Sequence, residues 1–293
     1  MPDAPIGGLP FVSIIIPVYQ DWTDLQTCLR ALSEQTYPHH RLEVIVVDNK
    51  GGFSLDGSES GSPSIRVLLE PQPGSYAARN RGVLDARGDI LGFTDADCIP
   101  SATWIERGLS EFLSHPGLDR VAGGIELVFR DRDKRSAVEL YEQVFAFRQQ
   151  EMVERWGAAI TANMFARRAV FSGIGLFSTA AYSAGDLEWG MRAHEAGYSI
   201  AYVPEAQVIH PARWTWKSII RKARRTHGGQ RSLRIRMSSP GSRPFERVRH
   251  ALSTPLLNGH RERGQVIAVL IVLKLVRALE GLRLRLGGKP VKS

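Results

Sequence analysis

Blocks of apolar residues alternate with amphipathic stretches over the first hundred residues of the chain. Residues 11–16, 42–47 and 90–94 are almost wholly apolar and rich in β-branched side chains. Such runs are typical of strands buried on both faces of a parallel sheet. Between the first two runs, apolar residues recur from Leu25 to Leu32 at the spacing of one helix face. This alternation predicts an α/β fold with a doubly wound, Rossmann-like, mostly parallel sheet.

The same pattern continues to about residue 212. A loop rich in Gly and Ser at 51–63 precedes a short strand at 65–69. The pattern then predicts helices at 75–85, 104–113, 138–156 and 183–196, and extended segments at 121–129, 159–167, 200–203 and 207–210. We find no internal repeat or heptad array in this order, which favours one α/β body.

Residues suited to ligand binding follow three of the predicted strands directly. Pro17 and Tyr19 follow the first strand, Asp48 ends the second, and Asp95 and Asp97 follow the strand at 90–94. In doubly wound sheets, ligands bind beyond the carboxyl ends of the strands. We therefore expect these residues to share one crevice.

Asp95 and Asp97 lie two residues apart at the end of a buried run. Side chains two apart on an extended chain point the same way, and neighbouring carboxylates repel each other unless a cation or donor groups lie between them. A hard divalent ion, Mg²⁺ or Mn²⁺, would relieve that repulsion and leave positions for diphosphate oxygens. The alternative is an acidic turn that only ends a strand.

The net charge of +8 is unevenly distributed. Residues 1–212 hold 18 Lys and Arg against 27 Asp and Glu, a net charge of −9, whereas residues 213–293 hold 20 against 3, a net charge of +17. This asymmetry predicts a globular domain over 1–212 and a basic, mainly helical C-terminal extension over 213–293. The extension should meet an anionic partner: lipid headgroups, phosphates or nucleic acid.

Within the extension, Trp214 and Trp216 stand among lysines and arginines, a composition typical of a membrane interface. The unbroken apolar run at 266–273 is too short to span a bilayer. It favours an interfacial helix on an anionic membrane surface, and the alternative is a packed terminal helix. Cys28 and Cys98 are the only cysteines, and residues 1–10 lack the pattern of a signal peptide. We therefore expect a cytoplasmic protein, peripheral on the inner face of the membrane.

An ordered set of motifs over residues 11–212 resembles family 2 glycosyltransferases, nucleotide-sugar-dependent enzymes of the GT-A fold. The motifs that carry the resemblance lie at 12–19, 28–32, 35–38, 43–48, 78–82, 95–97, 185–188, 196–198, 203–204 and 210. Each motif is short, and their order makes the resemblance specific. Beyond Arg213 the resemblance carries nothing.

The resemblance implies a role for each matching residue. Pro17 and Tyr19 would line the base pocket, Asp48 would accept a hydrogen bond from the base, and Arg79 and Ala96 would lie near the base and diphosphate. The alternatives are that Asp48 only ends a strand and that Arg79 is a solvated helix residue.

The resemblance also implies a metal site and a catalytic carboxylate. Asp97 and His210 would bind Mn²⁺ or Mg²⁺, and Asp95 would contact the ribose and the metal. Asp186 would be the general base that deprotonates the acceptor. Because Gly185 replaces the usual Glu before Asp186, Glu188 remains an alternative base, and Asp186 has the alternative of capping its helix. His210 has the alternative of an ordinary histidine at a strand end.

Asn163 and Trp189 are the candidates for contacting the acceptor, and Trp189 has the equal alternative of packing in the core. Gln20 and Asn49 replace the Asn and second Asp of many members. No Gln-x-x-Arg-Trp motif of processive synthases is present, which favours a single transfer.

The resemblance thus implies an inverting, metal-dependent transferase that moves a sugar from a nucleotide-diphosphate donor, typically a UDP-sugar, to a hydroxyl. A glycan or lipid-linked acceptor of envelope polysaccharide or glycolipid synthesis is the expected partner. A sugar-phosphate nucleotidyltransferase is one alternative, but the glycine-rich loop and lysine of that class are missing after the first strand. The other is a nucleic-acid-binding protein, but no recognised nucleic-acid module is present.

Overall fold

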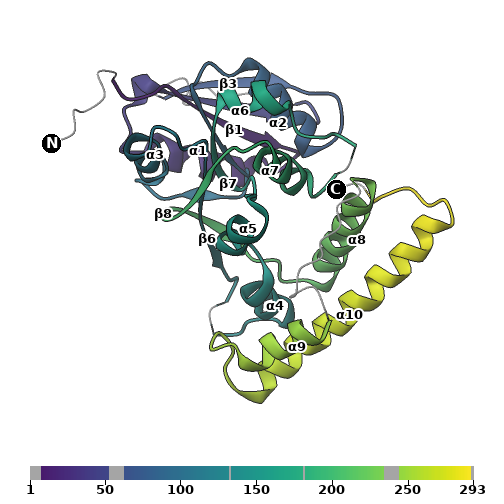
Figure 1. Cartoon of the computed structure of the whole chain (residues 1–293). Coiled ribbons are helices and arrows are strands. Elements are labelled where there is room, and N and C mark those ends of the chain that lie inside the picture. Colours follow the sequence, from purple (N-terminus) through teal and green to yellow (C-terminus); the bar gives the residue numbers. More distant parts are fainter. Residues whose placement is uncertain (1–7, 53–62, 132, 181, 234–243, 292–293) are drawn as a thin grey trace. The chain divides into compact units, whose positions relative to one another are not determined.

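The computed structural model describes the chain in five stretches (Figure 1). These are residues 8–52, 63–131, 133–180, 182–233 and 244–291. The chain forms two compact units, each taken by itself below. Unit 1 consists of Met1–Glu126, Gln149–Ser178 and Asp186–His210. Unit 2 consists of Leu127–Arg148, Thr179–Gly185 and Pro211–Ser293.

Four parallel strands form the N-terminal half of the sheet. They are β1 (Val12–Val18), β2 (Leu42–Asp48), β3 (Ser64–Leu69) and β4 (Ile90–Thr94). Val12 of β1 lies opposite Leu42 of β2 and Ile90 of β4. Every residue of β2 and β4 is buried, as expected for parallel strands that are covered on both faces.

The remaining strands extend this sheet with antiparallel pairs. They are β5 (Ile99–Pro100), β6 (Arg120–Val128), β7 (Asn163–Arg167) and β8 (Ile200–Pro211). β7 pairs with β4 and with β6, and β5 pairs with β8. The full order is β3-β2-β1-β4-β7-β6-β8-β5. The predicted α/β fold class is confirmed, and its parallel pairs lie in the half that carries most of the predicted donor-binding residues.

Helices connect the strands of this sheet, and several of them bury an apolar face. They are α1 (Trp22–Ser33), the short 3-10 helix η1 (His39–Arg41), α2 (Ser75–Asp85), α3 (Trp104–Ser114), α5 (Gln149–Trp156), α6 (Arg168–Ile174) and α7 (Gly185–Glu195). α1 buries the helical face that runs from Leu25 to Leu32, as its spacing predicted. One core cluster gathers Phe93, Phe171, Phe177 and Trp189.

Residues 138–156 form two helices rather than the one that the pattern predicted. α4 (Ala137–Phe145) ends just before Phe147, which has a φ of +49°, a conformation that L-residues seldom adopt. The buried Gln149 then bonds to the backbone of Ile160 and Asn163. These bonds hold the turn before β7, so the strand predicted from residue 159 begins only at Asn163. The short helix α6 was not predicted.

Unit 2 is a helical cluster. Its helices are α4, α8 (Trp216–Ser232), α9 (Pro244–Ser253) and α10 (Gly259–Arg285). α4 begins with a capping box between Ser136 and Glu139, which satisfies two backbone N–H groups at the helix start. Unit 2 contains the predicted C-terminal extension together with residues 127–148 and 179–185, which precede it in the chain.

The apolar run at 266–273 corrects a prediction. Val266, Val269, Leu270 and Leu273 are buried in one core cluster with residues of α4, α8 and α9. The alternative of a packed terminal helix therefore holds for this face of α10, since side chains buried in the protein cannot also enter a bilayer. In the stretches that the structure describes, no helix is long and apolar enough to cross a membrane.

Candidate active site

The carboxyl ends of β1, β2 and β4 lie at one edge of the sheet and bring the predicted donor residues there. Pro17 and Val18 of β1 pair with Val47 and Asp48 of β2. Tyr19, which follows β1, is 52% exposed, and the Lys50 ammonium lies 5.9 Å from its ring centre. An aromatic face at this edge is accessible to a planar base.

Asp48 is buried and shapes the loop that follows β2. Its Oδ1 accepts hydrogen bonds from the backbone N–H groups of Lys50 and Gly51 at 2.9 and 2.8 Å. Asn49 ties the same edge to α2, because its Oδ1 accepts from the N–H of Gly74 at 2.7 Å. Gly74 has a φ of +124°, which favours glycine. These bonds set where α2 begins.

α2 in turn delivers Arg79 to the end of β4. The Arg79 side chain is only 5% exposed, and its guanidinium forms an ion pair with Asp95. The same guanidinium lies 5.6 Å from the ring centre of Tyr76, one helical turn earlier. The alternative of a solvated Arg79 is therefore wrong. Ala96 is buried between the two carboxylates and offers little side-chain surface to a donor.

Asp97 lies close to a buried histidine from the end of β8. Oδ1 of Asp97 is 3.7 Å from Nε2 of His210. The sequence separates these residues widely, and the antiparallel pairing of β5 with β8 brings them together, with Ile99 opposite Ile209. Asp97, His210 and Cys98 form a group whose candidate ligand atoms all lie within 4.8 Å of one another.

Cys98 is a member of this group that sequence reasoning did not select. Burial, and then the carboxylates of Asp95 and Asp97, raise the pKa of the Cys98 thiol well above its usual range. The thiol lies 3.9 Å from the carbonyl of Ala162. Thiolate suits softer metals than Mg²⁺ or Mn²⁺, so Asp97 and His210 are the better-suited pair for a hard ion.

Asp186 occupies the first turn of α7 and accepts hydrogen bonds from two elements. Its Oδ1 accepts from the Tyr76 hydroxyl at 2.8 Å and from the N–H of Leu187 at 3.0 Å. The N–H of Thr161 approaches Oδ2 at 3.4 Å. Burial, followed by the charge of Asp186, raises the pKa of Tyr76, so the phenol stays protonated and donates.

Tyr76 contacts two of the candidate site residues, and sequence reasoning did not select it. It links Arg79, through its ring face, to Asp186, through its hydroxyl. The only signal in the sequence was its place in the first turn of the predicted helix that carries Arg79. An aromatic residue at such a position reads equally well as core.

The buried Arg120 holds α7 in place. Its guanidinium donates to the carbonyls of Gly157, Gly190 and Tyr198 at 2.8, 3.1 and 2.7 Å. Burial lowers the pKa of Arg120 to about 10, so the side chain remains charged at neutral pH. Gly190 belongs to α7, and this bond fixes the helix that carries Asp186.

Glu188 has a structural arrangement. Its carboxylate accepts from Arg192, one turn later, at 2.9 and 3.2 Å. Arg192 also donates to the carbonyls of Ile174 and Leu176. Glu188 therefore holds the side chain that fastens the segment after α6, which makes it less suited than Asp186 to accept a proton from a substrate.

Asn163 and Trp189 do not reach a position from which they could touch an acceptor, and both assignments are corrected. Asn163 is fully buried; it accepts from Trp104 and donates to the carbonyls of Gly124 and Ala206. Trp189 is fully buried, stacks on Phe171 at 4.4 Å between ring centres, and donates to a backbone carbonyl. Of the two alternatives for Trp189, core packing is correct.

The sheet order and the polar residues at the carboxyl ends of β1, β2 and β4 fit the GT-A class of fold. The chain belongs to glycosyl transferase family 2, whose model matches residues 13–175. It is 38% identical over 230 residues to glycosyltransferase AglE of Haloferax volcanii, a match that covers 76% of this chain and 73% of AglE. It is 26% identical to the probable glycosyltransferase YdaM of Bacillus subtilis, over 71% of this chain and 52% of YdaM.

Solved structures share the fold at low sequence identity. The mannosyltransferase PcManGT from Pyrobaculum calidifontis, in complex with GDP-Man and Mn2+, has a TM-score of 0.58 at 19% identity and covers 95% of this chain and 79% of its own. TarS 1-349 of S. aureus, in complex with UDP-GlcNAc, has a TM-score of 0.54 at 16% identity, over 90% of this chain and 72% of its own. The protein is thus a glycosyltransferase, and the nucleotidyltransferase alternative is not retained.

The core position of Trp189 leads to a first prediction. Trp189→Leu should lower the free energy of unfolding by about 3 kcal/mol, because it leaves a cavity beside Phe171. The matched control is Trp216→Leu, at a Trp that is 42% exposed, for which we expect a change within about 0.5 kcal/mol. Urea unfolding measures both. An unchanged unfolding free energy together with a raised acceptor KM would instead restore the acceptor role of Trp189.

Proposed function

We propose that this protein is an inverting, divalent-cation-dependent glycosyltransferase that uses a nucleotide-diphosphate sugar, most simply a UDP-sugar, and a hydroxyl acceptor. The acceptor is a glycan or a lipid-linked sugar of envelope polysaccharide or glycolipid synthesis. The observation that carries this proposal is the combination of Asp97 beside His210 with Asp186 beside Tyr76 in one unit. Asp97 and His210 suit the binding of a metal ion, and Asp186 suits the acceptance of a proton.

The nucleotide has a matching set of groups at the sheet edge. The exposed ring of Tyr19 suits stacking on the base, and Asp48 suits a hydrogen bond from an imide N–H. Pro17 lies near the end of β1, one position before Val18, which pairs with Asp48. Arg79 suits the negative charge of the donor, near the Asp95 carboxylate that would accept from the ribose. The solved structures in complex with GDP-Man and UDP-GlcNAc differ in the base of their nucleotide. Our proposal of uridine therefore rests on the carboxylate of Asp48 and not on those structures.

Asp97 and His210 fit a divalent cation. A carboxylate oxygen and an imidazole nitrogen 3.7 Å apart are the donor types that Mn²⁺ accepts, and oxygen ligands also suit Mg²⁺. Asp95 and Asp97 lie in the turn after β4, which the N–H of Cys98 closes by donating to the carbonyl of Asp95, and the Asp95 carboxylate is paired with Arg79. A bound cation would offset the charge that develops on the leaving diphosphate.

Asp186 is the proposed general base. Its carboxylate would take the proton of the acceptor hydroxyl as that oxygen attacks the anomeric carbon. The bond from the anomeric carbon to the diphosphate oxygen breaks as the new glycosidic bond forms, and a single displacement inverts the anomeric centre. The Tyr76 hydroxyl and the N–H of Leu187 orient the carboxylate through Oδ1.

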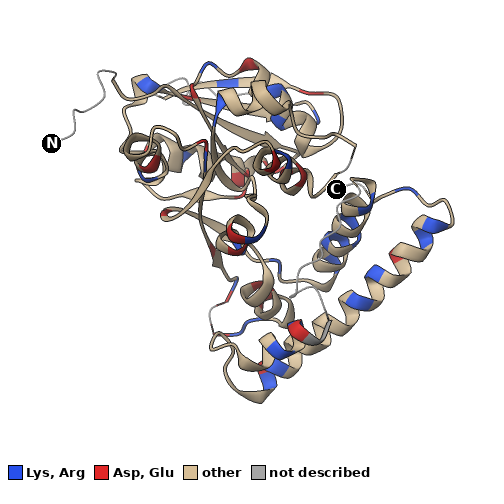
Figure 2. Ribbon diagram, viewed as in Figure 1, with Lys and Arg blue, Asp and Glu red and all other residues tan. Residues whose placement is uncertain are grey.

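Unit 2 supports attachment to an anionic membrane surface, by a face of α10 that differs from the predicted run. Four residues at i, i+4, i+8 and i+11 spacing share one side of the helix, and each is more than half exposed. They are Ile271, Leu275, Leu279 and Leu282, and we call these four residues the docking stripe. Lys274 and Arg285 are exposed beside it, and Figure 2 shows basic residues along α8, α9 and α10. Apolar residues flanked by cations suit contact with an anionic lipid surface better than contact with the same surface of a second copy of the chain.

Removal of the metal ligand gives the second prediction. Asp97→Asn should weaken Mn²⁺ binding at least about tenfold, because a neutral amide replaces a charged ligand, and EDTA should abolish transfer by the parent enzyme. The control is Asp89→Asn, at an exposed carboxylate of unit 1. Calorimetry measures metal binding and nucleotide release measures transfer over a panel of UDP-, GDP- and dTDP-sugars. Transfer that survives EDTA would contradict the metal assignment.

The third prediction concerns the base. Asp186→Asn keeps an oxygen for Tyr76 and Leu187 but cannot accept a proton, so kcat should fall about 100-fold or more. Nucleotide affinity and melting temperature should stay near those of the parent. Glu188→Gln, which weakens the contact with Arg192, should lower stability more than kcat. A fully active Asp186→Asn beside an inactive Glu188→Gln would move the role to Glu188.

The fourth prediction tests the docking stripe. Leu275→Ser/Leu279→Ser should reduce co-sedimentation with phosphatidylglycerol vesicles about tenfold or more, because two leucines no longer enter the interface. Leu84→Ser/Leu113→Ser, at exposed leucines of α2 and α3, is the matched control and should bind as the parent does. High salt should weaken binding of all forms. Parent protein that ignores anionic vesicles at low salt would overturn the attachment.

A further inference from the structure

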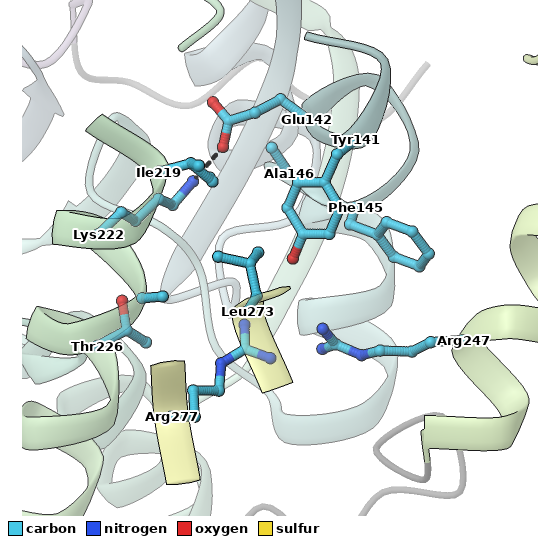
Figure 3. Close-up of a pocket in the computed structure, with 11 residues that line it drawn as sticks. Tyr141, Glu142, Phe145, Ala146, Ile219, Lys222, Thr226, Arg247, Leu273 and Arg277 are labelled. Carbon is cyan, nitrogen blue, oxygen red and sulfur yellow. Dashed lines mark hydrogen bonds and ion pairs between the residues drawn. The ribbon is translucent and has the colours of Figure 1, made fainter. Parts of the chain in front are cut away.

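A cavity of about 160 Å³ lies inside unit 2 (Figure 3), among residues of α4, α8, α9 and α10. Part of its wall is apolar or aromatic: Tyr141, Phe145, Ile219, Ala223 and Leu273. The remainder carries charge from Glu142, Lys222, Arg247 and Arg277. The lining therefore combines hydrocarbon contacts with three cations and one anion. None of these residues belongs to the active site of unit 1.

The carboxylate of Glu142, the one anion of the lining, is already paired with cations. Glu142 is buried, and its carboxylate accepts from the Lys222 ammonium at 2.7 Å. It also accepts from the N–H and the guanidinium of Arg213, at 3.1 and 3.2 Å. Despite burial, these cations hold the pKa of Glu142 below its usual value. The carboxylate thus already faces two positive charges and cannot neutralise a third.

Arg247 and Arg277 are the cations left over. In Figure 3 their guanidinium groups extend toward each other across the cavity, and the Tyr141 hydroxyl points toward them. The guanidinium of Arg247 lies 5.6 Å from the ring centre of Phe145. Within the described stretches, neither arginine forms an ion pair with a carboxylate.

Both carboxylates of α10 are paired with other arginines, and Glu139 of α4 accepts from the N–H groups of Arg130 and Ser136. Glu280, one turn beyond Arg277, is paired with Arg224 and Arg283. Glu262, near the start of α10, is paired with Arg135. Glu246 of α9 is not part of the cavity lining. Two guanidinium groups therefore line a partly enclosed space whose one lining carboxylate, Glu142, is already paired with Lys222 and Arg213.

This arrangement suits an oxyanion. Two facing cations repel each other, and an anion between them converts that repulsion into two attractions. Arginine binds phosphate through paired N–H donors, and a phenol hydroxyl can add a third contact. The apolar wall formed by Phe145, Ile219 and Leu273 would contact carbon atoms rather than more charge. A phosphate joined to hydrocarbon matches both halves of the lining.

We propose that this cavity binds the phosphate of an amphiphilic ligand, a phosphate monoester or diphosphate on a hydrocarbon chain. The identification of the natural ligand as a lipid-linked acceptor rests on the proposed function. The proposal that the cavity binds an anion does not depend on it. Leu273 and Arg277 face the cavity and the docking stripe lies on the exposed side of α10. The site is therefore separate from the proposed membrane-docking face.

The test is calorimetric titration of the full chain with three probes: farnesyl phosphate below its micelle concentration, farnesol and inorganic phosphate. Farnesyl phosphate should bind most tightly, inorganic phosphate about tenfold or more weakly, and farnesol without measurable heat. Arg277→Gln and Arg247→Gln should each weaken farnesyl phosphate binding about tenfold or more. Arg249→Gln, at an exposed arginine of α9, should bind as the parent does.

Each result has a defined reading. Equal affinity for farnesyl phosphate and inorganic phosphate, both lost in Arg277→Gln, supports the anion site and overturns the lipid ligand. Binding of farnesyl phosphate that Arg277→Gln and Arg247→Gln leave unchanged overturns the site. Circular dichroism confirms that the variants fold, and removal of one repelling charge should leave the melting temperature equal or higher. Mn²⁺-dependent UDP binding, measured on the same variants, tests the active site separately.

Discussion

Two like charges at the end of β4 are the constraint around which unit 1 is arranged. Asp95 and Asp97 lie two residues apart just after β4. Arg79 of α2 forms an ion pair with Asp95, and Nε2 of His210, from β8, lies 3.7 Å from Oδ1 of Asp97. The start of α2 is held by Asn49, and the position of β8 by its pairing with β5. Residues from distant segments of the chain thus meet at these two carboxylates, whose like charges favour nearby cations and hydrogen-bond donors.

The compensation reaches the proposed base through one side chain. Arg79 contacts the ring of Tyr76, and the Tyr76 hydroxyl donates to Asp186. A cation, an aromatic ring and a carboxylate thus form a continuous series of contacts between the proposed donor side and the proposed acceptor side. Substitution of Tyr76 would therefore disturb both sides, even though it carries no charge of its own.

The sequence was sufficient to predict β1, β2 and β4 and the polar residues that follow these strands. β1, β2 and β4 are uniformly apolar, so their burial and the place where they end can be predicted from composition alone. The proposed donor-binding residues could be assigned to one site because the carboxyl ends of parallel strands meet at one edge of the sheet. The pairing of Asp97 with His210 rested on family resemblance, since no local pattern indicates which late strand returns beside the first carboxylate.

The errors share one cause: an apolar or amphipathic pattern shows that a residue is buried but not against what. Asn163 and Trp189 looked available to a ligand, yet both satisfy their polar atoms inside the protein. The run at 266–273 looked suited to lipid, yet it faces other helices. The break near Phe147 depends on the tertiary bonds of Gln149, which no spacing rule contains.

α10 is apolar on two sides, and this restricts how its gene can change. Leu270 and Leu273 pack inward while Ile271 and Leu275 face outward, so the two faces interleave along one helix. Insertion or deletion of a single codon within α10 would rotate every later residue by roughly 100° relative to the earlier ones. Core leucines would then be exposed and stripe leucines driven toward the bundle. Point substitutions can adjust either face alone, but the length of this helix can change only in whole turns.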